Sequence, residues 1–148
     1  MGQIIYAMQC QGQGTPVSES PMVIKAATSC QSCSISSVVG PGGLESGIQA
    51  ANGGEATFES QVEMTSESTF KESGSISFGE GNVIQFDTLG EGNIGPGAEE
   101  GVNHGAVSWS IIGGQGQFEG ATGIITSNFT LDGSLKIIDN QFGVINVR

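Results

Sequence analysis

The chain has 148 residues, of which 15 are acidic and only 4 are basic, so its formal net charge is −11. This length suits a single domain, and we expect residues 1–148 to form one domain around one core. Because nucleic acids and anionic membranes are bound by surfaces rich in Lys and Arg, the composition argues against both as partners and is typical of an acidic, soluble protein.

No segment approaches the ~18 consecutive apolar residues of a membrane span. The start of the chain, MGQIIYAMQC, lacks the basic and apolar regions of a signal peptide. The three cysteines cannot all pair within the chain, so at least one thiol is free, which favours a reducing compartment. We therefore expect a cytoplasmic protein, with a mature form that has lost its leader as the alternative.

Alternation of apolar and polar residues, which is typical of strands, recurs along the chain, whereas helical periodicity is almost absent. In residues 105–112, for example, Val107, Trp109 and Ile111 share one face. The strands expected in chain order are 3–10, 20–28, a weaker 32–39, 57–66, 68–79, 82–88, 105–112, 122–131 and 135–147.

Glycine-rich segments separate these runs, and Asp132-Gly133 favours a tight hairpin turn. About eight short strands with such turns predict an all-β fold, a small antiparallel eight-stranded barrel. Residues 40–54 and 90–101 are the two long connections, and 40–54 could form a loop or one helical turn. Since compact hairpins need only 2–5 residues, we expect both connections to act as lids on the barrel.

Residues 113–123, GGQGQFEGATG, almost match a phosphate-binding loop. The spacing from Gly114 through Gly116 to Gly120 is one residue too long, and the segment that follows alternates as a strand instead of opening a helix. The pattern therefore favours a turn and bulge in which glycines adopt positive φ and Phe118 plugs one end of the barrel.

The pattern W-x-I-x-G-G-x-G-x-F-x-G-A-x-G, from Trp109 to Gly123, resembles the late hairpin of the allene oxide cyclase barrel, and dirigent proteins carry a related segment. The resemblance covers roughly residues 80–131. It implies an eight-stranded, calycin-like antiparallel barrel with an interior cavity. Some members of this superfamily guide cyclisations in natural product biosynthesis without a cofactor, including spirotetronate-type cyclases, while others bind ligands or have no known role. No catalytic residue can be assigned from this resemblance, because none lies in the matched segment.

Four residues are candidates for proton transfer. His104 is the only histidine and follows Glu99 and Glu100, so a carboxylate and an imidazole could meet at the barrel mouth. The alternative is an ordinary solvated loop. The phenol of Tyr6 is the fourth candidate, as a group that polarises a substrate.

The first interpretation of aromatic residues at alternating strand positions is that they pack in the core. In an eight-stranded barrel, however, the core and a ligand pocket share one wall. Phe86, Trp109 and Phe129 are therefore candidate substrate-binding residues as well as packing residues. The sequence leaves open which face of the Trp109 strand is interior.

Cys30-x-x-Cys33 lacks the strand–helix context of a redox site, and only Cys10 and His104 could complete a zinc site. We expect no metal and no cofactor. The leading hypothesis is a cofactor-independent cyclase or isomerase acting on an apolar small molecule in the barrel. The alternatives are a non-catalytic binder of a hydrophobic ligand and an assembly protein with a filled barrel. The substrate, the role of the cysteines and association into a homo-oligomer stay open.

Overall fold

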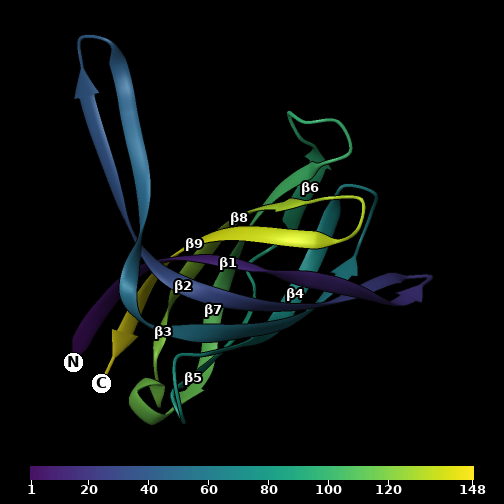
Figure 1. Cartoon of the computed structure of the whole chain (residues 1–148). Helices are drawn as coiled ribbons and strands as arrows, with labels where there is room; N and C mark the ends of the chain where they lie inside the picture. Colours follow the sequence, from purple (N-terminus) through teal and green to yellow (C-terminus); the bar gives the residue numbers. More distant parts are fainter.

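The computed structural model describes all residues from Met1 to Arg148, and most of them lie in β-strands (Figure 1). A three-residue 3₁₀ turn, η1 (Gly116–Phe118), is the single helical segment, and no helix is long and apolar enough to cross a membrane. The strands are β1 (Gly2–Glu19), β2 (Met22–Gly40), β3 (Gly43–Met64), β4 (Thr69–Ser77), β5 (Val83–Thr88), β6 (Gly92–Pro96), β7 (Asn103–Gln115), β8 (Thr122–Leu131) and β9 (Lys136–Val147).

The strands close into one antiparallel ring in the order β3-β2-β1-β9-β8-β7-β5-β4, with β4 pairing back to β3. The short strand β6 shares the position of β5, because both lie between β4 and β7. The ring thus has eight strand positions, which confirms the predicted eight-stranded barrel. It is uneven because β2 and β3 continue far beyond it (Figure 1).

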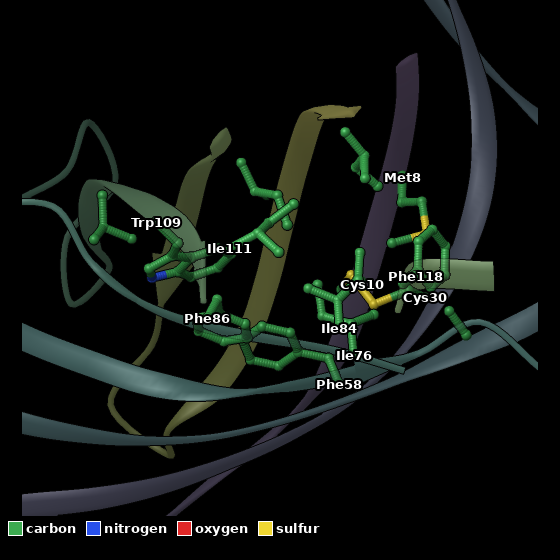
Figure 2. Packing of buried hydrophobic residues seen from close by; sticks show 14 of the residues in the cluster. Met8, Cys10, Cys30, Phe58, Ile76, Ile84, Phe86, Trp109, Ile111 and Phe118 are labelled. Atoms are coloured by element: carbon green, nitrogen blue, oxygen red, sulfur yellow. A yellow bond between two sulfur atoms is a disulfide. The ribbon is translucent and has the colours of Figure 1, made fainter. Parts of the chain in front are cut away.

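The predicted alternation places the apolar side chains inside the barrel. Val107, Trp109 and Ile111 are all buried, and Trp109 is only 1% exposed, so its strand presents this face to the interior. Ile84 and Phe86 on the neighbouring strand β5, and Phe58 on β3, pack with them inside the barrel (Figure 2).

One end of the barrel, which we call the floor, is closed by the glycine-rich segment 113–123. Phe118 of η1 is 2% exposed, and its ring lies 5.3 Å from that of Phe78. Gly116 and Gly120 both have positive φ, at 63° and 71°. The prediction of a glycine turn that plugs the barrel with Phe118 is confirmed.

A buried disulfide joins Cys10 and Cys30 beside Phe118 in the floor (Figure 2). The two residues are directly opposite each other on β1 and β2, and both side chains point inward. Cys33 is free and partly buried. Cys30 therefore pairs across the strands with Cys10, and not with its sequence neighbour Cys33.

The expectation that residues 40–54 form a loop or helical turn that acts as a lid is wrong. Residues 33–40 of β2 and 43–50 of β3 pair as a hairpin, with a turn at Pro41-Gly42. This hairpin projects from the floor end of the barrel. The connection 90–101 contains β6, followed by a turn at the opposite, open end.

Candidate functional site

A cavity of about 70 Å³ opens at the end of the barrel opposite the floor. It lies where β3 and β8 end and where β2, β4 and β9 begin, and β6 and β7 each add one residue, so seven strands contribute to its wall. Most of its lining is apolar, and the residues nearest the opening include Val62, Met64, Ile94, Phe129, Leu131 and Ile137.

Three aromatic rings in mutual contact form the base of this cavity. Phe86 lies 4.5 Å from Trp109 and 5.4 Å from Phe58, measured between ring centroids. Phe58 and Trp109 also line the cavity, whereas Phe86 lies behind them in the core. Figure 2 shows Trp109 and Phe86 on one side of the core cluster, with the disulfide and Phe118 on the other. A rigid aromatic layer therefore separates the open half of the barrel from the packed half.

Glu72 on β4 points into the cavity and is only 7% exposed. The Oγ of Ser60 donates a hydrogen bond of 2.5 Å to its Oε2. Burial, with a smaller contribution from the negative charge of Asp139, raises the pKa of the Glu72 carboxyl to about 8, while Ser60 and Trp109 oppose the shift. Glu72 is therefore protonated at neutral pH, and its carboxyl can donate a proton.

The backbone on both sides of Glu72 is held closely. Thr88 Oγ1 accepts a hydrogen bond from the Glu72 backbone N–H at 2.7 Å and donates one to its carbonyl oxygen at 2.6 Å. Gly74, two residues on, has no side chain, and a Cβ there would lie 2.1 Å from the carbonyl oxygen of Glu59. These contacts fix the direction in which the Glu72 side chain enters the cavity.

Asp139 on β9 faces the same cavity and is 4% exposed. Ser127 Oγ donates to its Oδ1 at 2.5 Å, and Gln141 Nε2 donates to its Oδ2 at 2.8 Å. Burial raises the pKa of Asp139 to about 6, while both hydrogen bonds oppose the shift. Asp139 is thus ionised at neutral pH and can accept a proton.

The two carboxyl groups therefore differ in protonation state inside one cavity. Such a pair, with pKa values pushed apart by their surroundings, is the usual basis of an acid and a base in one site. The order of the two pKa values agrees with the contacts, because Asp139 accepts two side-chain hydrogen bonds and Glu72 accepts one, from Ser60.

The indole of Trp109 adds a polar atom to the site. Its Nε1 is buried and has no hydrogen-bond partner in the structure, yet the indole lies near enough to the Glu72 carboxyl to lower its pKa. A buried donor without a partner is costly and is uncommon in folded proteins. This N–H is available to a hydrogen-bond acceptor on a molecule that enters the cavity.

The predicted site residues fall into three groups in the structure. Trp109 and Phe129 line the cavity, with Phe86 packed behind Trp109. Tyr6 lies toward the floor, where its hydroxyl donates to Gln141 Oε1 at 3.3 Å and so reaches Asp139 only through that amide. Burial, followed by the charge of Asp139, raises the pKa of the Tyr6 phenol.

Glu99, Glu100 and His104 lie outside the cavity. All three are exposed, in the β6–β7 turn and at the start of β7. Glu99 and His104 line an outer groove near the open end that contains none of the interior carboxyl groups. The structure does not bring these residues to the interior site, and their proposed part in proton transfer stays a prediction.

Glu72 and Asp139 were not among the residues singled out from the sequence. The signal that could have identified them is a charged residue at an inward position of a strand. Glu72 has the same parity as Phe70 and Ile76, and Asp139 the same parity as Ile137 and Ile145. A carboxyl group at a core position is rare unless it has a specific role.

No group of three or more His, Cys, Asp and Glu side chains is arranged to hold a metal ion. No protein-family model matches the sequence, and neither does any curated protein. A solved structure does match: the pterocarpan synthase dirigent protein GePTS1, at a TM-score of 0.62 and 16% sequence identity. The match covers 99% of this chain and 89% of that chain.

The chain has a dirigent-like barrel fold. The resemblance predicted from residues 80–131 is confirmed at the level of fold, and it extends through the first half of the chain, where the sequence showed no match. At 16% identity the similarity establishes the fold alone, so the function must be argued from the site.

Proposed function

We propose that the barrel binds a neutral, largely apolar small molecule at its open end and catalyses a cofactor-independent cyclisation or isomerisation of it. The observation that carries this proposal is the pair of buried carboxyl groups, Glu72 and Asp139, in a cavity whose other walls are mostly apolar. A purely passive apolar pocket has no need of two buried acids, each of which costs free energy to desolvate.

An intramolecular addition illustrates the chemistry that such a pair supports. Asp139 accepts the proton of a substrate hydroxyl as its oxygen forms a bond to an electrophilic carbon, and Glu72 donates a proton to the oxygen that becomes negative. The proton that Asp139 gains and the one that Glu72 loses balance, so the product is an isomer of the substrate, and transfer of a proton back from Asp139 to Glu72, the group of higher pKa, restores the enzyme. General acid–base assistance of this kind contributes typically ~10²–10⁴-fold to a rate.

The cavity would also orient the substrate, in addition to the proton transfer by its two carboxyl groups. The contacting rings of Phe58, Phe86 and Trp109 give it a rigid base, and the free Nε1 of Trp109 offers one oriented donor. Holding a flexible molecule close to its reactive geometry and excluding water lowers the barrier to ring closure.

The size of the cavity limits what enters it. A volume of about 70 Å³ accommodates only part of a drug-sized ligand, which typically occupies a pocket of ~300–1,000 Å³. The reacting oxygen atoms would therefore lie deep, between the carboxyl groups, while the rest of the molecule contacts Met64, Ile94 and Leu131 at the opening. The similar fold of a dirigent protein described as a pterocarpan synthase supports a role in natural product chemistry.

The test uses neutral hydroxy-enones, beginning with an ortho-hydroxychalcone, whose uncatalysed ring closure is a slow isomerisation that gives both enantiomers equally. We expect the protein to accelerate closure and to give an excess of one enantiomer, measured by chiral chromatography. Glu72→Gln and Asp139→Asn should each lower the rate at least 10-fold while the quenching of Trp109 fluorescence by the substrate persists.

The matched control is Glu59→Gln, which neutralises an exposed carboxyl on the outside of β3 and should leave the rate unchanged. Quenching of Trp109 without turnover of any member of the series would favour the alternative, a non-catalytic binder. Absence of both binding and turnover would contradict the proposal.

A further inference from the structure

β2 and β3 continue beyond the barrel as a two-stranded hairpin, residues 33–50, which we call the arm (Figure 1). The pairing of β1 with β2 ends at Ser32, and the pairing of β3 with β4 begins at Thr57. Neither edge of the arm is therefore paired with another strand. The arm bends away where Ala51–Gly54 on one strand oppose a single residue, Ser32, on the other.

Such a ribbon is poorly stable by itself. An isolated two-stranded hairpin is marginal in water, because it cannot bury an apolar face or satisfy both of its edges. Every residue from Ser34 to Ala50 is exposed in the single chain. The arm accordingly needs a surface to pack on.

The arm has one apolar face. Directly opposed residues of an antiparallel pair lie on the same face, and the register opposes Ile35 to Ile48 and Val39 to Leu44. Their exposed fractions are 55%, 53%, 83% and 69%. The single charged residue of the arm, Glu45, lies on the other face.

A second exposed apolar surface lies on the outside of the barrel, and we call it the wall. One row across it is Ile5, Val144 and Ile124, and the next is Ala7, Phe142 and Thr126, on β1, β9 and β8. Ile5, Phe142 and Ile124 are between 50% and 59% exposed. These two rows contain no charged side chain.

The distribution of charge indicates which surfaces two copies of the chain can bring into contact. Two copies of a chain with a net charge of −11 repel each other at most orientations. The outward face of β3 carries Glu55, Glu59 and Glu63, whereas the wall and the apolar face of the arm carry no charge. Arm and wall are thus the surfaces that two copies can join without placing carboxylates together.

The arm does not cover the wall of its own barrel. A groove of about 540 Å³ separates the base of the arm, at Cys33, Ile48 and Ala50, from Gln9 and Gln11 on the outside of β1. The residues across this groove are polar or charged, and they include Ser29, Gln31 and Glu55, so the apolar face of the arm has no apolar counterpart there.

We propose that the apolar face of the arm packs on the wall of a second copy of this chain. In a two-fold symmetric exchange each copy would supply one arm and one wall, so the contact would be made twice. The partner's wall would bury Ile35, Val39, Leu44 and Ile48 and give the hairpin the apolar cover that it lacks as a single chain.

The experiment compares the oligomeric state of three variants by light scattering and sedimentation. The wild type should be a dimer or a larger closed assembly at micromolar concentration. Leu44→Asn in the arm and Phe142→Asn in the wall should each raise the dissociation constant at least 10-fold. Val17→Asn alters a residue that is 55% exposed but lies in neither surface, and it should leave association unchanged.

Mixing the arm variant with the wall variant separates arm-to-wall contact from arm-to-arm contact. One intact arm then faces one intact wall, so the mixture should associate more tightly than either variant alone. Circular dichroism and the emission of buried Trp109 show whether each variant keeps its barrel. A monomeric wild type, a wall variant that associates like the wild type, or a mixture that associates no better than its components would overturn the proposal.

Discussion

The two halves of the barrel interior are built from the same alternating strands but are filled differently. The floor half packs the apolar side chains of Phe118, Phe78 and Ile76 together, and the Cys10–Cys30 disulfide lies at its boundary, where Cys10 is opposite Asp139 in the β1–β9 register. The open half contains Glu72 and Asp139 beside a cavity. The floor gains free energy from burial, whereas the open half gives some of it up to hold two acids out of water. Stability and chemistry are therefore separated along the barrel axis.

The largest expected effect is on the pH dependence of the free energy of unfolding, which the two acids of the open half should control. The folded-state pKa of Glu72 is about 8 against an ordinary 4.5, and that of Asp139 about 6 against 3.8, so the folded state binds more protons than the unfolded chain across this range. The free energy of unfolding should therefore fall as pH rises from about 4 to about 8, by up to about 5 kcal/mol for Glu72 at ~1.4 kcal/mol per pKa unit.

Urea denaturation at a series of pH values measures this dependence. Glu72→Gln should remove most of the loss above pH 6 and make the protein more stable than the wild type at pH 9. Glu59→Gln, on the exposed face of β3, corrects for the general effect of lowering the net charge. A wild-type stability that does not change between pH 4 and 8 would contradict the assigned protonation states.

The same two pKa values predict the pH dependence of catalysis. Asp139 must be ionised and Glu72 protonated, so kcat/KM should rise through about pH 6 and fall through about pH 8. Asp139→Asn should abolish the acidic limb along with most of the rate. A rate that keeps rising above pH 9 would show that Glu72 is not the acid.

A substitution in the floor should have the opposite effect on stability to one at the open end. Phe118→Ala removes a ring that is 2% exposed and leaves a cavity, at a cost of about 3–5 kcal/mol. The loss should be equal at pH 5 and pH 8, because no titrating group is involved. Urea denaturation at both pH values checks this. A loss below about 1 kcal/mol would show that the floor relaxes and does not brace the barrel.

The disulfide should contribute slightly less. Cys10 and Cys30 are 20 residues apart, and closing a loop of that length stabilises the folded state by about 3 kcal/mol in the chain-entropy model. The Cys10→Ala, Cys30→Ala double variant should lose about that amount, whereas Cys33→Ser should change stability little. Counting free thiols in the unfolded protein, with one expected, checks the pairing and shows whether the protein is oxidised where it is produced.

Trp109→Phe should have the smallest effect on stability. The substitution keeps an aromatic ring in contact with Phe86 and Phe58, so we expect a loss of less than about 1.5 kcal/mol. It also removes the unpaired Nε1, which offsets part of the cost. Ligand affinity should weaken more than stability, and isothermal titration measures it. Equal losses in both would indicate a packing role alone.

Residue pattern alone determined the fold class, most strand faces and the plug at Phe118. It did so because alternation and glycine turns are local consequences of backbone geometry. Residues 11–19 and 92–96 were missed as strands because glycine and glutamine there give no apolar alternation. Of the arm, the strand at 32–39 was predicted, but its partner at 43–50 was missed because it carries short polar and apolar residues and packs on nothing else in the chain.

Only the tertiary structure decided the site. Glu72 and Asp139 are 67 positions apart in the sequence and meet because β4 and β9 lie across the ring from each other. Their pKa values depend on burial and on Ser60, Ser127 and Gln141, and no local pattern encodes these contacts. The disulfide pairing also depends on tertiary structure. The β1–β2 register places Cys10 opposite Cys30, so Cys10 and not Cys33 is its partner. The strands thus follow from local residue pattern, whereas closure of the ring determines which of their side chains face one another.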